Sequence, residues 1–421
     1  MSHVDTDRRH ADELDAKDPL GDLRGRFVVT DPELIYLDGN SLGRLPLATA
    51  ERLRHVVAAE WGGELVGAWR HWIDLPVQVG DSIGEHLVGA APGQVVVSDS
   101  TTVNLYKLAA AALDARPGRR VIATDDDNFP TDRYVLAGLA AQRGLELRLV
   151  RSDPVTGPSL AAVGAAVDDD VALVSLSHIA YRSGALVDME TVTRIAHDAG
   201  ALALWDLSHS AGSFPVQLDR TGADLAVGCT YKYLNGGPGA PAFLYVRHDL
   251  QAGLRQPVWG WFGQRDQFAM GPHYDPVPGV GRFLGGTPPV PALCAVDEGV
   301  RLLAEAGIGR LRAKGVMMTD YLIALADAWL APLGFSVASP RDPARRGSHV
   351  ALRHPEAYRI CRAAIERARV VADFRAPDRL RLGPAPLTSS FAEVWTALDR
   401  LRHLVEAREY EDYDATPGRV T

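Results

Sequence analysis

Between residues 94 and 250, the sequence alternates short apolar runs, rich in β-branched residues, with amphipathic helical patterns. The run "QVVVSDS" precedes the helical "TTVNLYKLAAAALDA", "RVIATDDDNFP" precedes "TDRYVLAGLAAQRG", and "VALVSLS" precedes "METVTRIAHDAG". Strands that are apolar throughout and separated by helices are typical of a mostly parallel sheet covered on both faces. The alternation therefore predicts an α/β protein with a doubly wound sheet.

The chain after residue 285 has a different pattern. A mostly helical stretch is followed by the apolar runs "FSVASP", "SHVALRHP", "VVADFR" and "RLRLGPAP" around the helical "EAYRICRAAIERARV". This pattern predicts a smaller α+β domain, and 421 residues are too many for one average core. We expect an N-terminal segment (1–50) that packs with the small domain, a large cofactor-binding domain (51–285) and the small C-terminal domain (286–421).

Charge and cysteine content argue against several classes of function. The formal net charge of -9 leaves no dominant basic face, so we expect no nucleic-acid partner. Cys229, Cys294 and Cys361 lie far apart without a CxxC pair, so neither a disulfide framework nor a metal site is indicated. The N-terminus lacks the apolar stretch of a secretory signal, and no run of about 18 apolar residues predicts a membrane span. We therefore expect a cytoplasmic protein.

In a doubly wound sheet, ligands bind beyond the carboxyl ends of the strands, so the residues after each apolar run are the candidates for function. Ser100, Thr101 and Thr102 open a helix after the first run, where hydroxyl and free N–H groups can bind a phosphate. Phe129 and Asp132 follow the second run and could cover and contact a flat cofactor. Taken alone, each of these residues is more often explained by helix capping or by ordinary packing.

Asp206, His209 and Lys232 follow the next two apolar runs. Asp206 ends a buried strand with no cation adjacent in sequence, so a bound cation would offset the cost of burying it. His209 alone is more typical of a structural histidine. Lys232 lies between two tyrosines in "TYKYLNGGPG", where a partly apolar site favours Schiff-base chemistry, although a strand-end lysine can also simply extend to solvent.

The order of these features favours one cofactor. Pyridoxal phosphate (PLP) needs an amine for its aldehyde, an anion for its pyridinium nitrogen, a helix end for its phosphate and a stacking partner for its ring. The four features occur on one predicted sheet in a workable order. Together they indicate a PLP site more strongly than any of them does alone.

The same segments resemble those of kynureninases, fold-type-I PLP-dependent enzymes of the aspartate aminotransferase superfamily. The resemblance extends over nearly the whole chain, and "YKYLNGGPG" and "GNSLG" are its most specific parts. It also includes "NFPTD", "DLSHSAG", "GWFG", "GGTPP", "VVADFRAP" and "RLRLGPAPL". The resemblance implies a PLP-transferase fold of type I, with Lys232 as the lysine that binds the cofactor covalently.

The resemblance also implies roles for individual residues. Lys232, Tyr231 and Asp206 would be catalytic, and Arg381 would fork onto the substrate α-carboxylate. Ser41, Trp72 and Ile73 would bind the substrate, although Trp72 and Ile73 lie in a segment (65–76) that is shorter than usual and that ordinary core packing explains equally well. The residues that would hold the cofactor are Thr101, Thr102, Phe129, Asp132, Ser177, Asp206, His209, Tyr231 and Lys232, with Trp261 and Thr287 from the partner chain of a homodimer.

The implied reaction is hydrolytic cleavage of the Cβ–Cγ bond of L-kynurenine or a ring-substituted kynurenine such as 3-hydroxy-L-kynurenine, giving an anthranilate and L-alanine. It would belong to the kynurenine pathway of tryptophan catabolism and NAD biosynthesis, or to specialised metabolite synthesis. The residues themselves leave three alternatives open: an aminotransferase, a cysteine desulfurase, and a non-catalytic PLP-binding module. The desulfurase is disfavoured because Cys361 lies in a helical pattern rather than a loop.

Overall fold

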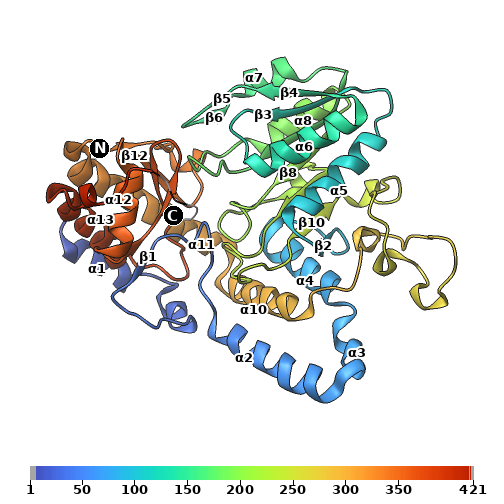
Figure 1. Ribbon diagram of the computed structural model, residues 1–421, viewed down its shortest axis with the longest axis horizontal. Coiled ribbons are helices and arrows are strands. Elements are labelled where there is room, and N and C mark those ends of the chain that lie inside the picture. The colour runs from blue at the N-terminus through green and yellow to red at the C-terminus, as the bar shows by residue number, and fades with distance from the viewer. Residues whose placement is uncertain (1–5, 417, 419–421) are drawn as a thin grey trace.

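The structure, a computed structural model, describes residues 6–416 and 418. Figure 1 shows two units side by side, one built on a large sheet and one formed mainly by the C-terminal part of the chain. In spatial order, the strands of the large sheet are β2 (Val95–Val97), β10 (Phe243–Val246), β9 (Leu225–Gly228), β8 (Leu202–Asp206), β7 (Val171–Ser177), β3 (Val121–Asp125) and β4 (Glu146–Val150).

The large sheet is parallel except for β10, which runs antiparallel to both of its neighbours. The connection from β9 to β10 contains no helix, and a parallel return to the same sheet would need a helical crossover. Side chains alternate between the faces: Leu202 and Leu204 of β8 belong to one apolar core, and Ala203 and Trp205 to the other. The predicted α/β class with a doubly wound, mostly parallel sheet is confirmed.

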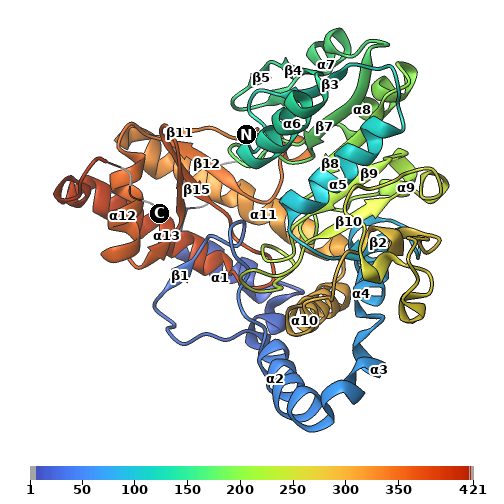
Figure 2. The same ribbon diagram turned by 45° about the vertical axis from the view of Figure 1, so that its right-hand side comes forward.

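Helices cover both faces of this sheet (Figure 2). One face packs against α5 (Thr101–Asp114) and α6 (Pro130–Arg143). The opposite face packs against α4 (Leu75–Ile83), α7 (Leu160–Ala166), α8 (Met189–Asp198) and α10 (Val290–Ala306). The smaller elements of this unit are α2 (Leu47–His55), α3 (Trp69–Trp72), α9 (Leu218–Thr221), β5 (Ser152–Asp153) and β6 (Gly157–Pro158).

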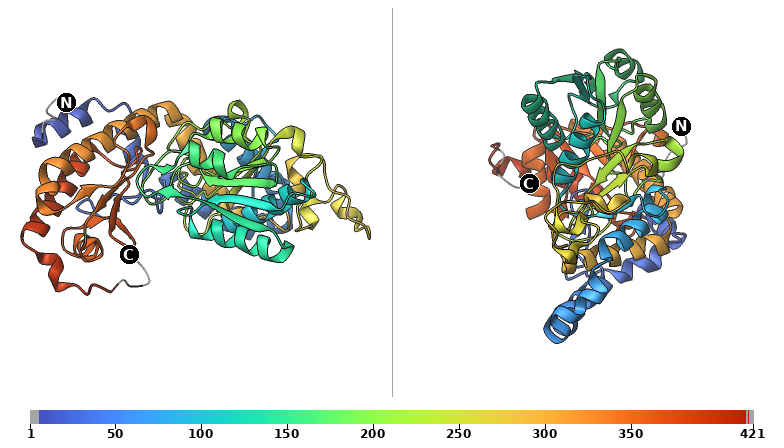
Figure 3. Two further views of the ribbon diagram at one scale, coloured as in Figure 1. Left: turned by 90° about the horizontal axis from the view of Figure 1, so that it is seen from above. Right: turned by 90° about the vertical axis from the view of Figure 1, so that its right-hand side faces the viewer.

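The second unit contains a four-stranded antiparallel sheet with its own apolar core. Its strands, in spatial order, are β11 (Ser336–Val337), β12 (Val350–Arg353), β15 (Arg379–Leu382) and β14 (Asp373–Arg375). The helices that contribute to its core are α1 (Arg8–Ala16), α11 (Ile308–Leu325), α12 (Ala357–Glu366) and α13 (Phe391–Glu406). Seen from above in Figure 3, the two units form an elongated molecule.

The N-terminal segment contacts both cores. Ala11, Ile35 and Leu37 belong to the core of the second unit, where β1 (Ile35–Tyr36) pairs in parallel with β13 (Val370–Val371). Leu20 and Phe27 belong instead to a core of the large sheet. The domain boundaries at residues 50 and 285 stay a prediction.

One stretch of the described chain, Ile308–Leu333, is long and apolar enough to cross a membrane by length and composition alone. Its helix α11 packs against α13 and contributes Met318, Leu322 and Leu325 to the core of the second unit. Core helices of this kind commonly have such a composition, so the stretch is weak evidence for a membrane span.

Candidate active site

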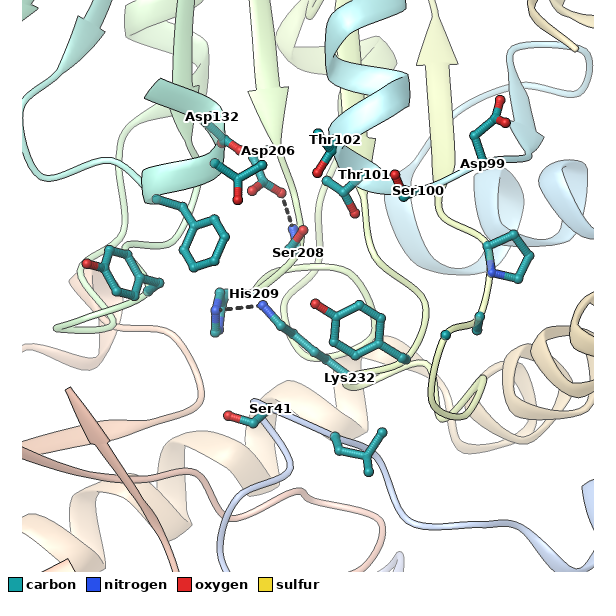
Figure 4. A pocket seen from close by; sticks show the side chains of 18 of the residues that line it. Ser41, Asp99, Ser100, Thr101, Thr102, Asp132, Asp206, Ser208, His209 and Lys232 are labelled. Carbon is teal, nitrogen blue, oxygen red and sulfur yellow. Dashed lines mark hydrogen bonds between the residues drawn. The ribbon is translucent and has the colours of Figure 1, made fainter. Parts of the chain in front are cut away.

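A cavity of about 880 Å³ opens at the carboxyl edge of the large sheet (Figure 4). It lies where β7 and β8 end and where α5 and α6 begin, which is the position expected for a ligand site in a doubly wound sheet. The predicted site residues that line it are Ser41, Thr101, Thr102, Phe129, Asp132, Ser177, Asp206, His209, Tyr231 and Lys232.

The N-terminus of α5 forms one wall of the cavity. The Ser100 hydroxyl caps the helix by accepting a hydrogen bond from the backbone N–H of Val103 at 3.3 Å, and Thr101 and Thr102 form the first turn. Unpaired N–H groups and the helix dipole make such a terminus suited to a phosphate. Asp99 also lines this wall, but its charge is balanced because buried Lys107 donates to it at 2.7 Å.

Two carboxyl groups meet beside this wall. Asp206, which is 7% exposed at the end of β8, accepts a hydrogen bond from the backbone N–H of Ser208 at 2.7 Å. Burial, and then the neighbouring Asp206, raises the pKa of Asp132 well above its usual range, and the two side chains share a hydrogen bond. Asp132 therefore holds a proton at neutral pH, and the Asp206 carboxyl group beside it faces the cavity, where it can pair with a positively charged ligand group.

Lys232 faces these carboxyl groups from the loop after β9. Its Nζ lies 3.0 Å from Nε2 of His209 and about 6 Å from the ring centroids of Phe129 and Tyr231 (6.0 and 5.9 Å). Burial, and then the charge of Lys232, lowers the pKa of His209 well below its usual range. His209 is therefore a neutral imidazole that can accept a hydrogen bond from the lysine amine.

The two most specific sequence motifs are joined at this loop. The backbone N–H of Gly43, in "GNSLG", donates to the carbonyl of Tyr231 at 2.8 Å. A Cβ on Gly43 would lie 2.3 Å from the carbonyl oxygen of Lys232, so no side chain fits there. The motif therefore requires glycine because the two backbones touch, and this contact fixes the position from which Lys232 extends.

Aromatic and polar groups complete the wall opposite Lys232. The Phe129 ring is 38% exposed and meets the Tyr181 ring edge-on, with centroids 5.2 Å apart. Ser177 donates to the side-chain oxygen of Asn128 at 2.7 Å, which holds the loop that presents Phe129. Tyr181 also lines the cavity although it was not predicted. It belongs to "VSLSHIAYRSG", the same strand-end segment as Ser177, and this nearness in sequence is the only signal that points to it.

Arg381 lies directly behind the cavity wall rather than on it. Its guanidinium is 1% exposed, and it donates to the Ser41 hydroxyl at 3.0 Å, to the carbonyl of Tyr181 and to both carboxylate oxygens of Asp373. Ser41 does line the cavity. A carboxylate at Ser41 would therefore meet a guanidinium that is already fixed in place.

Besides Arg381, four predicted site residues do not line the cavity among the described residues of this chain. Trp72 is buried against the neighbouring helices and donates from Nε1 to Glu60 at 2.6 Å, and Ile73 lines a separate depression with Phe262. Trp261 is 41% exposed, and Thr287 is exposed two residues before Pro289, which does line the cavity. The roles given to these four residues stay predictions.

Two family models match the chain. The model described as "Kynureninase C-terminal domain" matches residues 311–401, and the model described as "Aminotransferase class-V" matches residues 82–352. A kynureninase of Pseudomonas fluorescens is 44% identical over 405 residues, covering 94% of this chain and 95% of the relative. A kynureninase of Burkholderia pseudomallei (strain 1106a) is 43% identical over 423 residues, covering 98% and 99%.

Solved structures share the fold at lower identity. The apo cysteine desulfurase of Thermococcus onnurineus NA1 superposes with a TM-score of 0.79 at 20% identity, covering 92% of this chain and 98% of that chain. A mutant of C-DES, with glycine covalently linked to its PLP cofactor, has a TM-score of 0.75 at 18% identity, covering 91% and 97%. These likenesses establish the fold class.

Proposed function

The chain belongs to the kynureninase family, and from that premise we propose that the cavity in Figure 4 is its active site. The chain is a PLP-dependent hydrolase that cleaves a carbon–carbon bond of a kynurenine. The products of this cleavage are an anthranilate and L-alanine. The proposal therefore concerns which residues perform each part of the reaction.

The residues present fit the cofactor on several observations. The α5 terminus with Thr101 and Thr102 would hold the phosphate, and Asp206 would pair with the pyridine nitrogen. The exposed Phe129 ring would stack on the pyridine ring, and the Lys232 amine would bind the aldehyde carbon. Bound there, PLP supplies an electron sink that stabilises negative charge on the substrate carbons.

The protein groups would then bind the substrate and move protons. Lys232 would take the proton from the substrate α-carbon, and neutral His209 at 3.0 Å would orient the free amine for this step. Burial, and then Cys229, raises the pKa of Tyr231, so its hydroxyl stays protonated at neutral pH and can donate. Ser41 and Arg381 would hold the substrate carboxylate.

The observation that carries this assignment is the placement of Lys232 beside His209 in the same cavity that Asp206 lines. The test is a product assay of PLP-loaded protein with L-kynurenine and 3-hydroxy-L-kynurenine in parallel, following the anthranilate formed. We expect cleavage of at least one of them, and the faster reaction identifies the preferred ring. If neither is cleaved while both change the visible spectrum, the cofactor site is right and the substrate assignment is wrong.

We also propose that the enzyme works as a homodimer. Large apolar side chains are exposed on the segment 259–270, where Trp259, Phe268 and Met270 are 62%, 68% and 70% exposed. This segment and the α2–α3 region project from the body of the molecule in Figures 1 and 3. Large apolar side chains exposed together on one segment are typical of interaction sites, and we propose that a second copy brings Trp261 and Thr287 toward a cavity.

Analytical ultracentrifugation is expected to give a mass of twice 45.4 kDa at micromolar concentration. A monomer that retains full activity under those conditions would contradict the dimer.

A cytoplasmic location is part of the same proposal. The three cysteines are buried and unpaired, as is usual in a reducing compartment. Cell fractionation with an antibody against the chain tests this location, and recovery in a secreted or membrane fraction would contradict it. The downstream metabolite that is lost when the gene is deleted would distinguish tryptophan catabolism from specialised metabolite synthesis.

A further inference from the structure

Four charged groups form a compact cluster behind Ser41. Arg381 donates from Nε to Oδ1 of Asp373 at 2.8 Å, and Arg375 lies 2.7 Å from Oδ2 of the same carboxylate. The Ser41 hydroxyl donates to Oδ2 of Asp373 at 2.8 Å. Asp38, three residues before Ser41, is the fourth member. Its backbone pairs with that of Gly383, two residues after Arg381, and the charges of Asp373, Arg381 and Arg375 act on its carboxyl group.

The two carboxyl groups of the cluster have unequal surroundings. Asp373 receives hydrogen bonds from Arg381 and Ser41, and although burial opposes ionisation, these partners hold its pKa below the usual range. Asp38 has one oxygen, Oδ1, sealed from solvent without a hydrogen-bond partner among the described residues. Burial, and then the charge of Asp373, raises the pKa of Asp38 to about 7. Asp38 is therefore the member that can gain or lose a proton near neutrality.

The groups that face Asp38 come from every element packed around it. They include side chains of its own segment, of the two neighbouring strands, of α12 and of the loop that carries Lys232. These groups are Tyr36, Ser41, Tyr233, Cys361, Asp373, Arg375 and Arg381. The pKa values of Tyr36, Tyr233 and Cys361 are all raised, chiefly by burial, so these groups stay neutral between pH 6 and 8.

The charge balance of the cluster changes when an anion arrives. With Asp38 ionised, the two guanidinium groups are matched by two carboxylates, and the cluster is neutral. A substrate carboxylate would then leave one uncompensated negative charge in a buried place, which is costly. Protonation of Asp38 restores neutrality without moving any side chain.

We propose that Asp38 takes up one proton from solvent when the substrate carboxylate binds at Arg381 and Ser41. This inference rests on the proposed function, because it requires that carboxylate site. The proton adds to the Asp38 carboxylate, and no covalent bond of the substrate changes. Asp38 thereby acts as a positioning residue that matches the charge of the site to the charge of the ligand.

The test uses the PLP-loaded enzyme and 4-(2-aminophenyl)-4-oxobutanoate, a kynurenine analogue that keeps the carboxylate but lacks the α-amine. Calorimetric titrations at pH 8 in two buffers with different ionisation enthalpies give the number of protons taken up on binding. Because about nine-tenths of a group with a pKa near 7 is ionised at pH 8, we expect uptake of about 0.9 proton. The dissociation constant should rise roughly tenfold between pH 6 and pH 8.

Asp38→Asn is expected to abolish both the proton uptake and the pH dependence of the dissociation constant. Glu33→Gln is the matched control, because Glu33 lies in the same segment but is exposed and pairs with Arg400. Glu33→Gln should take up the same number of protons on binding the analogue as the unmodified enzyme does. If Asp38→Asn does not fold, the unmodified enzyme still tests the proposal. A dissociation constant for the analogue that stays constant between pH 6 and 8 would overturn it.

Arg381→Ala separates this inference from the proposed function. If Arg381→Ala leaves the affinity for the analogue unchanged, the carboxylate site itself is wrong and both proposals fail. If Arg381→Ala abolishes binding but the unmodified enzyme takes up no proton, only the role of Asp38 is refuted. Proton uptake that persists in Asp38→Asn would likewise assign the proton to another group.

Discussion

Lys232→Ala is expected to abolish the release of anthranilate and the covalent link to the cofactor. The substitution removes both the amine that binds the aldehyde carbon and the base placed to move the substrate α-proton. A positioned general base contributes roughly 10²–10⁴-fold to rate, so the loss should be at least about 10³-fold when the covalent link is lost as well. Borohydride reduction followed by peptide mass analysis measures the link directly.

This measurement can identify the modified residue without ambiguity, because the chain has few lysines. Besides Lys232 it contains Lys17, Lys107 and Lys314. Lys107 and Lys314 are buried in ion pairs with Asp99 and Asp18, at 2.7 and 2.6 Å. Lys17 is exposed, so Lys17→Ala is the matched control and should keep full activity. A reduced PLP adduct that survives Lys232→Ala would show that Lys232 is not the cofactor lysine.

The fold and the cofactor site could be predicted from sequence because both depend on local patterns. Continuous apolar runs separated by helices lead to a parallel sheet, and the carboxyl-edge rule then selects Thr101, Asp206 and Lys232 as neighbours. The structure brings all three to one cavity. Resemblance supplied the specific activity, which the relatives named as kynureninases support.

Contacts between distant segments could not be predicted in the same way. Asp373 and Ser41 meet although 332 positions separate them, and neither periodicity nor strand-end position signals such a contact. The neighbouring rings of His209 and His349, with centroids 5.3 Å apart, likewise join two units of the chain. The antiparallel direction of β10 depends on the absence of a helix after Lys232, which apolar patterning alone does not reveal.

The structural likeness to cysteine desulfurases does not extend to their chemistry. A desulfurase requires a nucleophilic thiol on an accessible loop. Cys229, Cys294 and Cys361 are all buried, and Cys361 lies within α12 as its helical pattern predicted. Burial raises the pKa of Cys294 to about 11 and that of Cys361 to about 12, which keeps both thiols protonated and unreactive. This chain and the cysteine desulfurases therefore share the fold.

Arg381→Ala is expected to raise the KM for L-kynurenine roughly 10²-fold or more, because losing one member of a buried, hydrogen-bonded charge pair typically costs about 2–5 kcal/mol. Arg381→Lys should recover only part of this loss, since an ammonium keeps the charge but not the two-pronged geometry. Steady-state kinetics on PLP-loaded protein measures both variants.

A specific loss of carboxylate binding must be separated from a damaged fold. Asp373 would lose one of its guanidinium partners in Arg381→Ala, whereas Arg375 would remain 2.7 Å away and keep the carboxylate paired. Arg353→Ala is the matched control, because Arg353 lies on the adjacent strand β12 but is exposed and pairs with Asp378. The control should leave both the KM and the melting temperature close to those of the unmodified enzyme, because an exposed ion pair contributes little to stability. An unchanged KM in Arg381→Ala would instead show that Arg381 does not hold the substrate carboxylate.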